Sequence, residues 1–209
     1  MKCQSMIGSL VLCALVCSPL LGTGARAEGS VQEGATKAAP CTACHGPSGN
    51  SSNPLWPSLA GQHPLYVLRQ LQAFKAGTRT DPVMSAMAAP LSDDDMQDLA
   101  AYFAAQTPAG LEADPGKVSE GERLYRGGDQ KSTIAACAAC HGPSGHGNPA
   151  ASFPSIRGQH ASYVVAQLKA YRSGNRKTDQ AQNQMMRSVA SGLSDSQIEA
   201  VASYIQGLR

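Results

Sequence analysis

The sequence has little of several features that mark common classes of protein. Aromatic residues make up only 5% of the chain, with a single tryptophan. No block of lysine and arginine suggests a nucleic-acid-binding surface. No Asn-Gly pair, a common signal of a β-hairpin, is present. After residue 27, no stretch approaches the roughly 18 apolar residues that a membrane-spanning helix needs. These absences argue against a nucleic-acid-binding protein, a hairpin-rich fold and a membrane-spanning protein.

The first 27 residues have the pattern of a secretory signal peptide. Lys2 precedes an apolar run over residues 6–21, and the segment GTGARA then ends in an Ala-x-Ala cleavage pattern. We expect cleavage after Ala27 and export of a soluble protein to the periplasm. Three cysteines leave with the signal peptide: Cys3, Cys13 and Cys17. A lipoprotein that keeps Cys17 is disfavoured, because valine precedes it where a lipobox needs glycine or alanine.

The four remaining cysteines lie in two closely similar segments. Residues 41–50 read CTACHGPSGN, and residues 137–146 read CAACHGPSGH. Disulfides are the simplest interpretation in an oxidising compartment, but they leave the two histidines unexplained. A zinc site made of two Cys-x-x-Cys pairs usually has about 15–20 residues between the pairs, whereas 92 residues separate them here.

Covalent attachment of heme c accounts for the cysteines and the histidines together. Thioether bonds to the two heme vinyl groups need thiols about one helical turn apart, and residues i and i+3 share a helix face. The histidine at i+4 lies on the same face, so its imidazole points at the iron. We therefore predict two covalently attached heme c groups. Their cysteines are Cys41, Cys44, Cys137 and Cys140, and their iron-binding histidines are His45 and His141.

The two motifs belong to a longer internal repeat. PSLAGQHPLYVLRQLQAFKAGTRTD begins at Pro57, and PSIRGQHASYVVAQLKAYRSGNRKTD begins at Pro154. The chain therefore contains two copies of one domain. We assign residues 28–105 and 118–209 to the two domains, and residues 106–117 to the linker between them.

The repeated segments carry helical patterns, so the predicted fold class is all-α. The apolar residues spaced for one helix face in the first copy are Leu65, Leu68, Leu71 and Phe74. Their counterparts in the second copy are Val164, Leu168 and Tyr171. Ser92 with Asp95, and Ser194 with Gln197, are spaced as capping boxes that open the last helix of each copy. A covalently held heme would complete the core of such small domains.

The sixth ligand of each iron is predicted by aligning the two copies. After residue 27 the methionines are Met84, Met87, Met96, Met185 and Met186. Met84 precedes Ser92 by eight residues, and Met186 precedes Ser194 by the same number, so these two methionines are equivalent. A ligand that both irons need recurs in both copies, whereas a core methionine is exchangeable for another apolar residue. We select Met84 and Met186, with Met87 and Met185 as the alternatives.

The remaining histidines are interpreted as structural. His63 and His160 recur in the GQH segment before a predicted helix, where packing or helix capping is expected. His146 is expected to be a solvated loop residue. The buried N–H of each iron-binding histidine needs an acceptor that fixes the ring. The backbone carbonyls of Pro57 and Pro154 are the natural candidates, because both prolines follow their motif at nearly the same distance.

With these features, the chain resembles the diheme cytochromes c of the cytochrome c4 family. The resemblance covers nearly all of the sequence after residue 27 and rests on CTACHG, CAACHG, the paired GQH segments, GERLYRGG and ASYIQGLR. It implies two tandem class I cytochrome c domains, related by internal duplication across a pseudo-twofold axis, with the heme propionates near the interface. It also implies ligation of one iron by His45 and Met84, and of the other by His141 and Met186.

The resemblance further implies a periplasmic electron-transfer protein that is not an enzyme. Its implied donor is a quinol–cytochrome c oxidoreductase, its implied acceptor is a heme-copper terminal oxidase, and its implied association with the membrane is loose and peripheral. Two alternatives are the cytochrome subunit of a periplasmic dehydrogenase and a diheme peroxidase. A peroxidase needs an open iron in at least one half, whereas both halves offer a methionine at the matching position.

The two halves differ in charge. Residues 28–110 carry four basic and seven acidic residues, whereas residues 111–209 carry eleven basic and eight acidic residues. Such a charge dipole would orient encounters with redox partners, because complementary charge acts mainly on the association rate.

Overall fold

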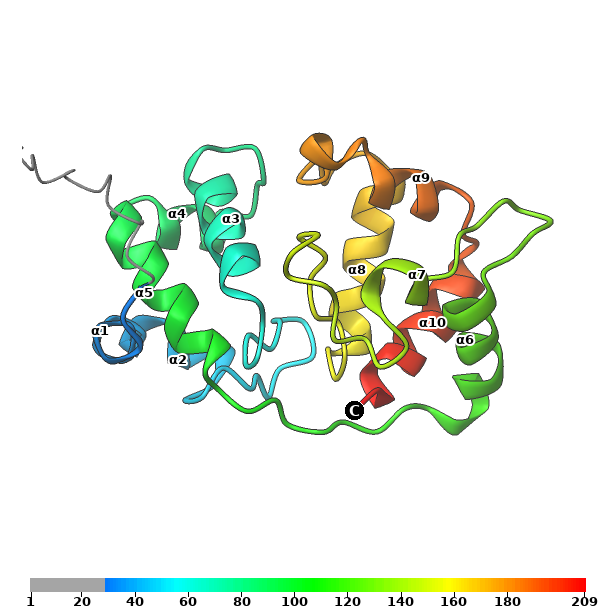
Figure 1. Cartoon of the computed structure of the whole chain (residues 1–209), viewed down its shortest axis with the longest axis horizontal. Coiled ribbons are helices and arrows are strands. Elements are labelled where there is room, and N and C mark those ends of the chain that lie inside the picture. Colours follow the sequence, from blue (N-terminus) through cyan, green and yellow to red (C-terminus); the bar gives the residue numbers. More distant parts are fainter. Residues whose placement is uncertain (1–28) are drawn as a thin grey trace, which may run out of the picture.

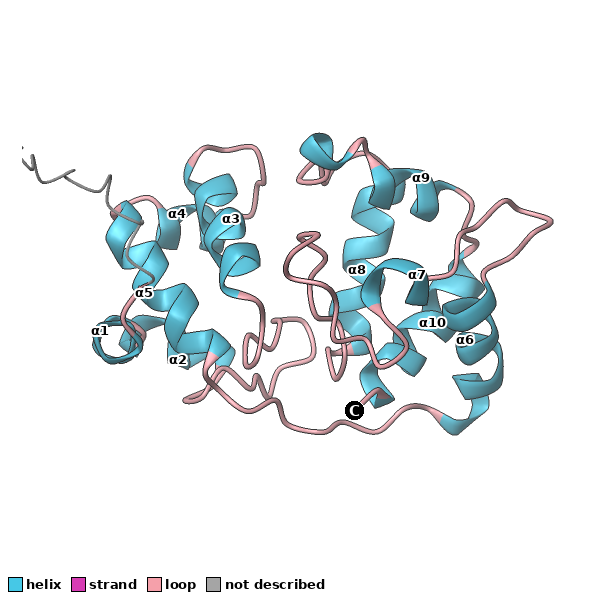
Figure 2. Ribbon diagram, viewed as in Figure 1, coloured by secondary structure: helices cyan, strands magenta, loops and turns pink. Residues whose placement is uncertain are grey.

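Two helical lobes lie side by side in the computed structural model, which describes residues 29–209 (Figure 1). The predicted signal peptide lies outside the described residues. An extended connection runs along one edge of the molecule and joins the lobes. Apart from two isolated β-bridges, the described residues form helices, turns and loops (Figure 2). The all-α prediction is confirmed.

The helices of the two lobes follow one another in the same order. The first lobe contains α1 (Val31–Lys37), α2 (Ala39–His45), α3 (Pro64–Lys75), α4 (Pro82–Ala88) and α5 (Asp93–Ala104). The second contains α6 (Pro115–Gly127), α7 (Ala138–His141), α8 (Ala161–Arg172), the 3-10 helix η1 (Gln180–Gln182), α9 (Met185–Ser191) and α10 (Asp195–Gly207). The second lobe thus repeats the first, with η1 as an addition before α9. Helix α6 begins within the segment assigned to the linker.

Each lobe is built around the packing of its first helix on its last. Helix α1 packs on α5, and α6 packs on α10. Ser92 and Ser194 open α5 and α10 with capping boxes, in which the serine side chain accepts from the N3 backbone and the N3 side chain accepts from the serine N–H. Both predicted caps are confirmed. They fix where each last helix begins.

The core-facing side of α3 agrees with the predicted one at Leu71 and Phe74 but not at Leu65. Val67 and Phe74 are buried and Leu71 packs against the core, but Leu65 is 57% exposed. The prediction was wrong for Leu65 because its spacing fitted a helix face without indicating where that face would end. Tyr66 and Gln70, on another side of α3, reach the second lobe instead.

The GQH segments form a reciprocal interface between the lobes. The Gln62 side chain donates to the carbonyl of Ser155 at 2.7 Å and accepts from the Ser155 N–H at 3.0 Å. Gln159 repeats this pair of bonds with Ser58, at 2.8 and 2.9 Å. Each amide side chain therefore extends the backbone of the opposite lobe, which is the pattern that a pseudo-twofold axis produces.

The histidines of the GQH segments also act across this interface. His63 Nε2 donates to the carbonyl of His146 at 2.8 Å, and His160 Nε2 donates to the carbonyl of Ser51 at 2.8 Å. Both rings are buried, and neither makes a side-chain capping bond at the start of α3 or α8. The packing interpretation is confirmed and the capping interpretation was wrong. His146 is exposed as expected, although its ring lies edge-on to that of His63.

Candidate heme centres

A single cavity of about 1310 Å³ runs from one Cys-x-x-Cys-His motif to the other. Both cysteines and the histidine of each motif line it, and it is walled largely by apolar side chains of α3, α4, α8 and α9. A cavity that contains both motifs has room on either side of the interface for an apolar ring system. This shape fits a heme group at each motif.

The sequence folds each motif so that its histidine is held rigidly. His45 ends α2 and His141 ends α7, and a glycine with positive φ, Gly46 or Gly142, turns the chain away directly afterwards. His45 Nδ1 donates to the carbonyl of Pro57 at 2.8 Å, and His141 Nδ1 donates to the carbonyl of Pro154 at 2.9 Å. The predicted proline acceptors are confirmed. With Nδ1 used as the donor, Nε2 is the nitrogen available to iron.

Burial keeps the two imidazoles neutral. It lowers the pKa of His45 and of His141 below the ordinary value, and the hydrogen bonds to the proline carbonyls only partly offset it. A neutral imidazole keeps the lone pair that iron requires. The two rings are therefore in the protonation state of metal ligands.

The cysteines do not have the properties of a redox-active or metal-binding thiol site. No disulfide joins any of the four. Burial raises the pKa of Cys137 to about 11, and burial followed by the charge of Cys44 raises that of Cys41. A reactive Cys-x-x-Cys site needs a lowered thiol pKa. In residues 29–209, no three His, Cys, Asp or Glu side chains gather as a metal site would require. The disulfide and zinc interpretations therefore lose support, and thioether attachment fits.

Two short helices carry a methionine toward the cavity. Asp81 caps α4 by accepting from the N–H groups of Val83 and Met84, at 3.0 and 2.8 Å. In the second lobe, Asp179 accepts from the backbone N–H and the guanidinium of Arg187, at 2.9 and 2.8 Å. Arg187 directly follows Met186 in the chain. The same type of residue thus anchors each methionine-bearing segment. Met84 and Met186 line the cavity and are partly buried.

The alternative methionines are more exposed than the selected pair. Met87 and Met185 are each 37% exposed, although both also touch the cavity. Met96 is fully buried in α5 and does not line the cavity. This difference in burial supports the choice made from the repeat.

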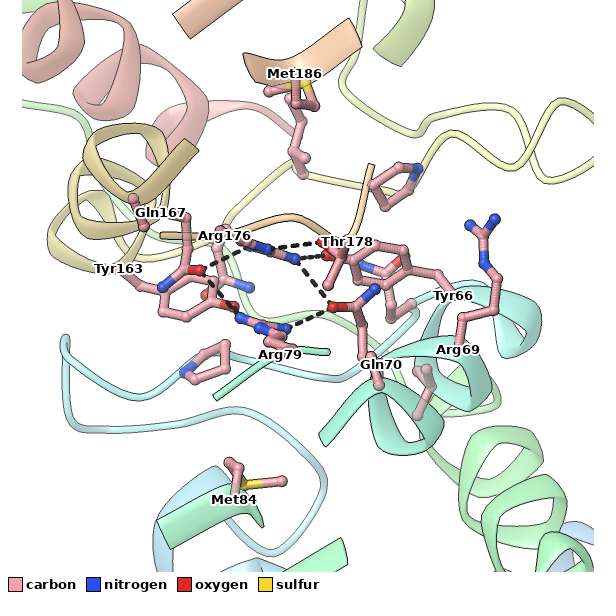
Figure 3. Close-up of a pocket in the computed structure, with 18 of the residues that line it drawn as sticks. Tyr66, Arg69, Gln70, Arg79, Met84, Tyr163, Gln167, Arg176, Thr178 and Met186 are labelled. Carbon is pink, nitrogen blue, oxygen red and sulfur yellow. Dashed lines mark hydrogen bonds between the residues drawn. The ribbon is translucent and has the colours of Figure 1, made fainter. Parts of the chain in front are cut away.

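The structure adds polar residues that sequence reasoning missed. Between the two methionines lies a cluster that we call the interdomain arginine cluster (Figure 3). It consists of Tyr66, Gln70, Arg79, Tyr163, Gln167 and Arg176. Their signal in the sequence is the recurrence of tyrosine, glutamine and arginine at equivalent positions of the two copies.

Comparison with known proteins decides the family. A family model described as cytochrome c matches residues 31–106 and again residues 118–209. Cytochrome c4 of Azotobacter vinelandii is 47% identical over 193 residues, which cover 88% of this chain and 91% of the relative. The chain belongs to the cytochrome c4 family.

Further relatives agree with this assignment. The crystal structure of reduced recombinant cytochrome c4 from Pseudomonas stutzeri superposes with a TM-score of 0.84 at 46% identity, covering 87% of this chain and 100% of that one. A protein named thiosulfate dehydrogenase electron acceptor, from Thiomonas intermedia, is 40% identical over 174 residues, covering 81% of this chain and 78% of the relative. The predicted tandem cytochrome c domains are thereby confirmed.

As a cytochrome c4, the protein is a diheme electron carrier and not an enzyme. Its Cys-x-x-Cys-His motifs hold two heme c groups, with methionine as a further ligand, and its partners are redox proteins. The heme supplies a one-electron couple, and the protein sets its potential through the axial ligands, burial and hydrogen bonding.

Proposed function

We propose that this cytochrome c4 carries electrons in the periplasm from a quinol–cytochrome c oxidoreductase to a heme-copper terminal oxidase. The observation that supports this most is the single cavity, because it joins both heme motifs across the domain interface. An electron that enters at one iron then has a short route to the other. The proposal includes domain boundaries at 28–105 and 118–209. It also includes a signal peptide that is cleaved after Ala27.

In this proposal each iron is held by one histidine and one methionine. His45 with Met84 serves the first heme, and His141 with Met186 serves the second. Each heme is attached by two thioether bonds. The first heme is bound by Cys41 and Cys44, and the second by Cys137 and Cys140. The histidine rings are oriented by Pro57 and Pro154. Methionine opposite histidine gives a closed, high-potential site that suits electron transfer and not peroxide chemistry.

Partner docking is supported by the surface around the first heme site. Leu55, Trp56 and Val83 are exposed and also line the cavity. They offer apolar contact close to the heme edge, as redox partners require for brief, close encounters. Among residues 29–209, no helix is long and apolar enough to cross a membrane. A loose peripheral contact with the membrane is the association that we propose.

Oxidation by a terminal oxidase tests the proposal. The reduced protein is mixed with membranes that contain a heme-copper oxidase, and the loss of the reduced heme band is followed at increasing salt concentration. We expect saturable oxidation that slows as salt rises, because the two halves carry opposite net charge. Absence of oxidation at every salt concentration, with both hemes intact, would contradict the proposed acceptor.

A second role is favoured by one relative. The thiosulfate dehydrogenase electron acceptor at 40% identity suggests that a periplasmic dehydrogenase is an alternative donor. Thiosulfate with purified thiosulfate dehydrogenase would then reduce the oxidised protein at a rate that rises with dehydrogenase concentration. Reduction by this enzyme but not by quinol–cytochrome c oxidoreductase would assign the chain to sulfur oxidation.

A further inference from the structure

The segment that carries Met186 is longer than its counterpart in the first lobe. Asp81 and Asp179 end the repeated segment of each copy. Met84 follows Asp81 by three positions, whereas Met186 follows Asp179 by seven, so the second copy has four additional residues before its methionine. They form η1 and the start of the turn between η1 and α9 (Figure 1). The two proposed methionine ligands are therefore supported by different local structures.

The short segment of the first lobe is held by local geometry. Pro82 occupies the first position of α4, where its ring fixes φ at a helical value. The Asp81 carboxylate accepts from the N–H groups of Val83 and Met84, at 3.0 and 2.8 Å. Within residues 29–209, Asp81 forms no salt bridge. Asparagine would cap α4 about as well, because the cap needs an acceptor oxygen and not a charge.

The longer segment of the second lobe contains backbone strain. Asn183 and Gln184 are both in the left-handed region, with φ of 52° and 59°. Asparagine tolerates this conformation, but glutamine seldom adopts it, because its Cβ crowds the backbone. Gln184 is the N-cap of α9, and its side chain makes no capping bond. Within residues 29–105, no residue other than glycine has a positive φ. The strain is therefore confined to the methionine-bearing segment of one lobe.

A buried ion pair holds this strained segment in place. The Asp179 carboxylate accepts from the backbone N–H of Arg187 at 2.9 Å and from its Nε at 2.8 Å. The Asp179 carbonyl also accepts from the N–H of Gln184 at 3.0 Å. The side chains of Asp179 and Arg187 are only 4% and 17% exposed. These bonds span the strained turn, and two of them end on the residue that directly follows Met186.

We propose that Asp179 and Arg187 are positioning residues that hold Met186 on the second iron, and that the second heme is the one whose sixth position opens first. This inference rests on the proposed ligation by Met84 and Met186. While the ion pair is intact, the site stays closed. When the pair is broken, relief of strain in the turn favours a conformation in which the thioether leaves the iron.

The position that Met186 leaves is suited to a small neutral ligand such as carbon monoxide. Met186 packs beside Val164 and Val189 against the apolar core of the second lobe, and all three line the cavity. An apolar wall disfavours a charged ligand, which would lose its hydration there. In the exchange, the Met186 thioether leaves with its electron pair, carbon monoxide donates a pair in its place, and the iron stays ferrous.

The first test is carbon monoxide binding by the reduced full protein with both hemes attached. Asp179→Asn keeps the shape of the side chain but leaves the Arg187 guanidinium buried without an anion. We expect this variant to bind about one carbon monoxide per protein at saturation, and the wild type to bind none. Asp81→Asn is the matched variant of the first lobe, and should bind none because asparagine preserves the cap.

Combined variants assign the iron that opens. Added to Met84→Ala, Asp179→Asn should raise binding to about two molecules of carbon monoxide per protein, whereas added to Met186→Ala it should leave binding at about one. Arg187→Gln, added to Asp179→Asn, removes the unpaired buried charge and should lower the affinity for carbon monoxide toward that of the wild type. A general loss of packing in the second lobe would not be reversed by this second substitution.

Hydrogen exchange gives a readout that does not depend on the iron. In Asp179→Asn the backbone amides of α9 should exchange about tenfold faster than in the wild type, because hydrogen bonds to a charged group are lost. The amides of α4 in Asp81→Asn should exchange at the wild-type rate. Gln184→Gly should slow exchange in α9, because glycine adopts a positive φ without strain. Gln184→Ala should not slow it, because alanine keeps the strain.

The inference is wrong if Asp179→Asn binds no carbon monoxide, or if Asp81→Asn opens the first iron equally. It is also wrong if α9 exchanges alike in Gln184→Gly and Gln184→Ala. If Asp179→Asn fails to incorporate heme, the two Gln184 variants still decide, because both keep the ion pair. A Met186→Ala variant that binds no carbon monoxide would instead contradict the proposed ligation, and with it the proposed function.

Discussion

Met84→Ala is expected to open the iron of the first heme and to leave the second heme unchanged. Loss of the thioether ligand removes the closed, low-spin site, so the affected heme should bind carbon monoxide and its potential should fall. The weak near-infrared charge-transfer band of methionine ligation should drop to about half its intensity, because one of two sites is lost. Met186→Ala should give the same result at the second heme.

The matched controls are Met87→Ala and Met185→Ala. Both methionines lie on the same short helices as the proposed ligands but are 37% exposed. We expect near-wild-type spectra and no binding of carbon monoxide. A changed band in Met87→Ala, with an unchanged band in Met84→Ala, would show that the choice made from the repeat was wrong.

Gly121→Ala is expected to destabilise the second lobe strongly for so small a change. Helix α6 crosses α10 at this residue, and a Cβ there would lie 2.3 Å from the carbonyl oxygen of Ala200 and 2.7 Å from Cβ of Tyr204. Neither atom is the mobile end of a side chain, so the helices must separate. Overpacking of this kind costs about 1–3 kcal/mol. Gly34 occupies the same position between α1 and α5, with a Cβ 2.1 Å from the carbonyl oxygen of Asp98.

Gly127→Ala provides the control within the same helix. Nothing lies within 4 Å of a Cβ at that position, and alanine favours a helix over glycine by up to about 1 kcal/mol. Guanidinium chloride unfolding of the heme-containing protein should therefore give a lower free energy of unfolding for Gly121→Ala and an unchanged or higher one for Gly127→Ala. Equal effects of the two substitutions would refute the close helix crossing.

Much of the site was predictable because its determinants are local. The spacing of Cys41, Cys44 and His45 is read within one helical turn, and the capping boxes at Ser92 and Ser194 each span four residues. The acceptor carbonyl of Pro57 lies only 12 residues from its histidine. Short separations of this kind leave few alternative geometries.

The interface was not predictable because its contacts join residues that are far apart in the chain. The bonds of Gln62 to Ser155 span 93 residues, and that of Arg176 to Tyr66 spans 110. Local periodicity indicates that a side chain is polar or apolar, but not that it will meet the other copy. The same limit explains why the prediction for Leu65 was wrong. Its spacing fits a buried helix face, but α3 leaves it exposed. Only the recurrence of the polar residues in both copies contained the signal.

The central claim is that one chain holds two covalently attached heme c groups. Intact-mass measurement of the purified periplasmic protein tests it most directly, together with acidified acetone extraction, which removes heme that is not covalently bound. We predict the mass of the chain from residue 28 onward plus two hemes, with no heme extracted. A mass that corresponds to a single heme, or heme that appears in the acetone phase, would contradict the account.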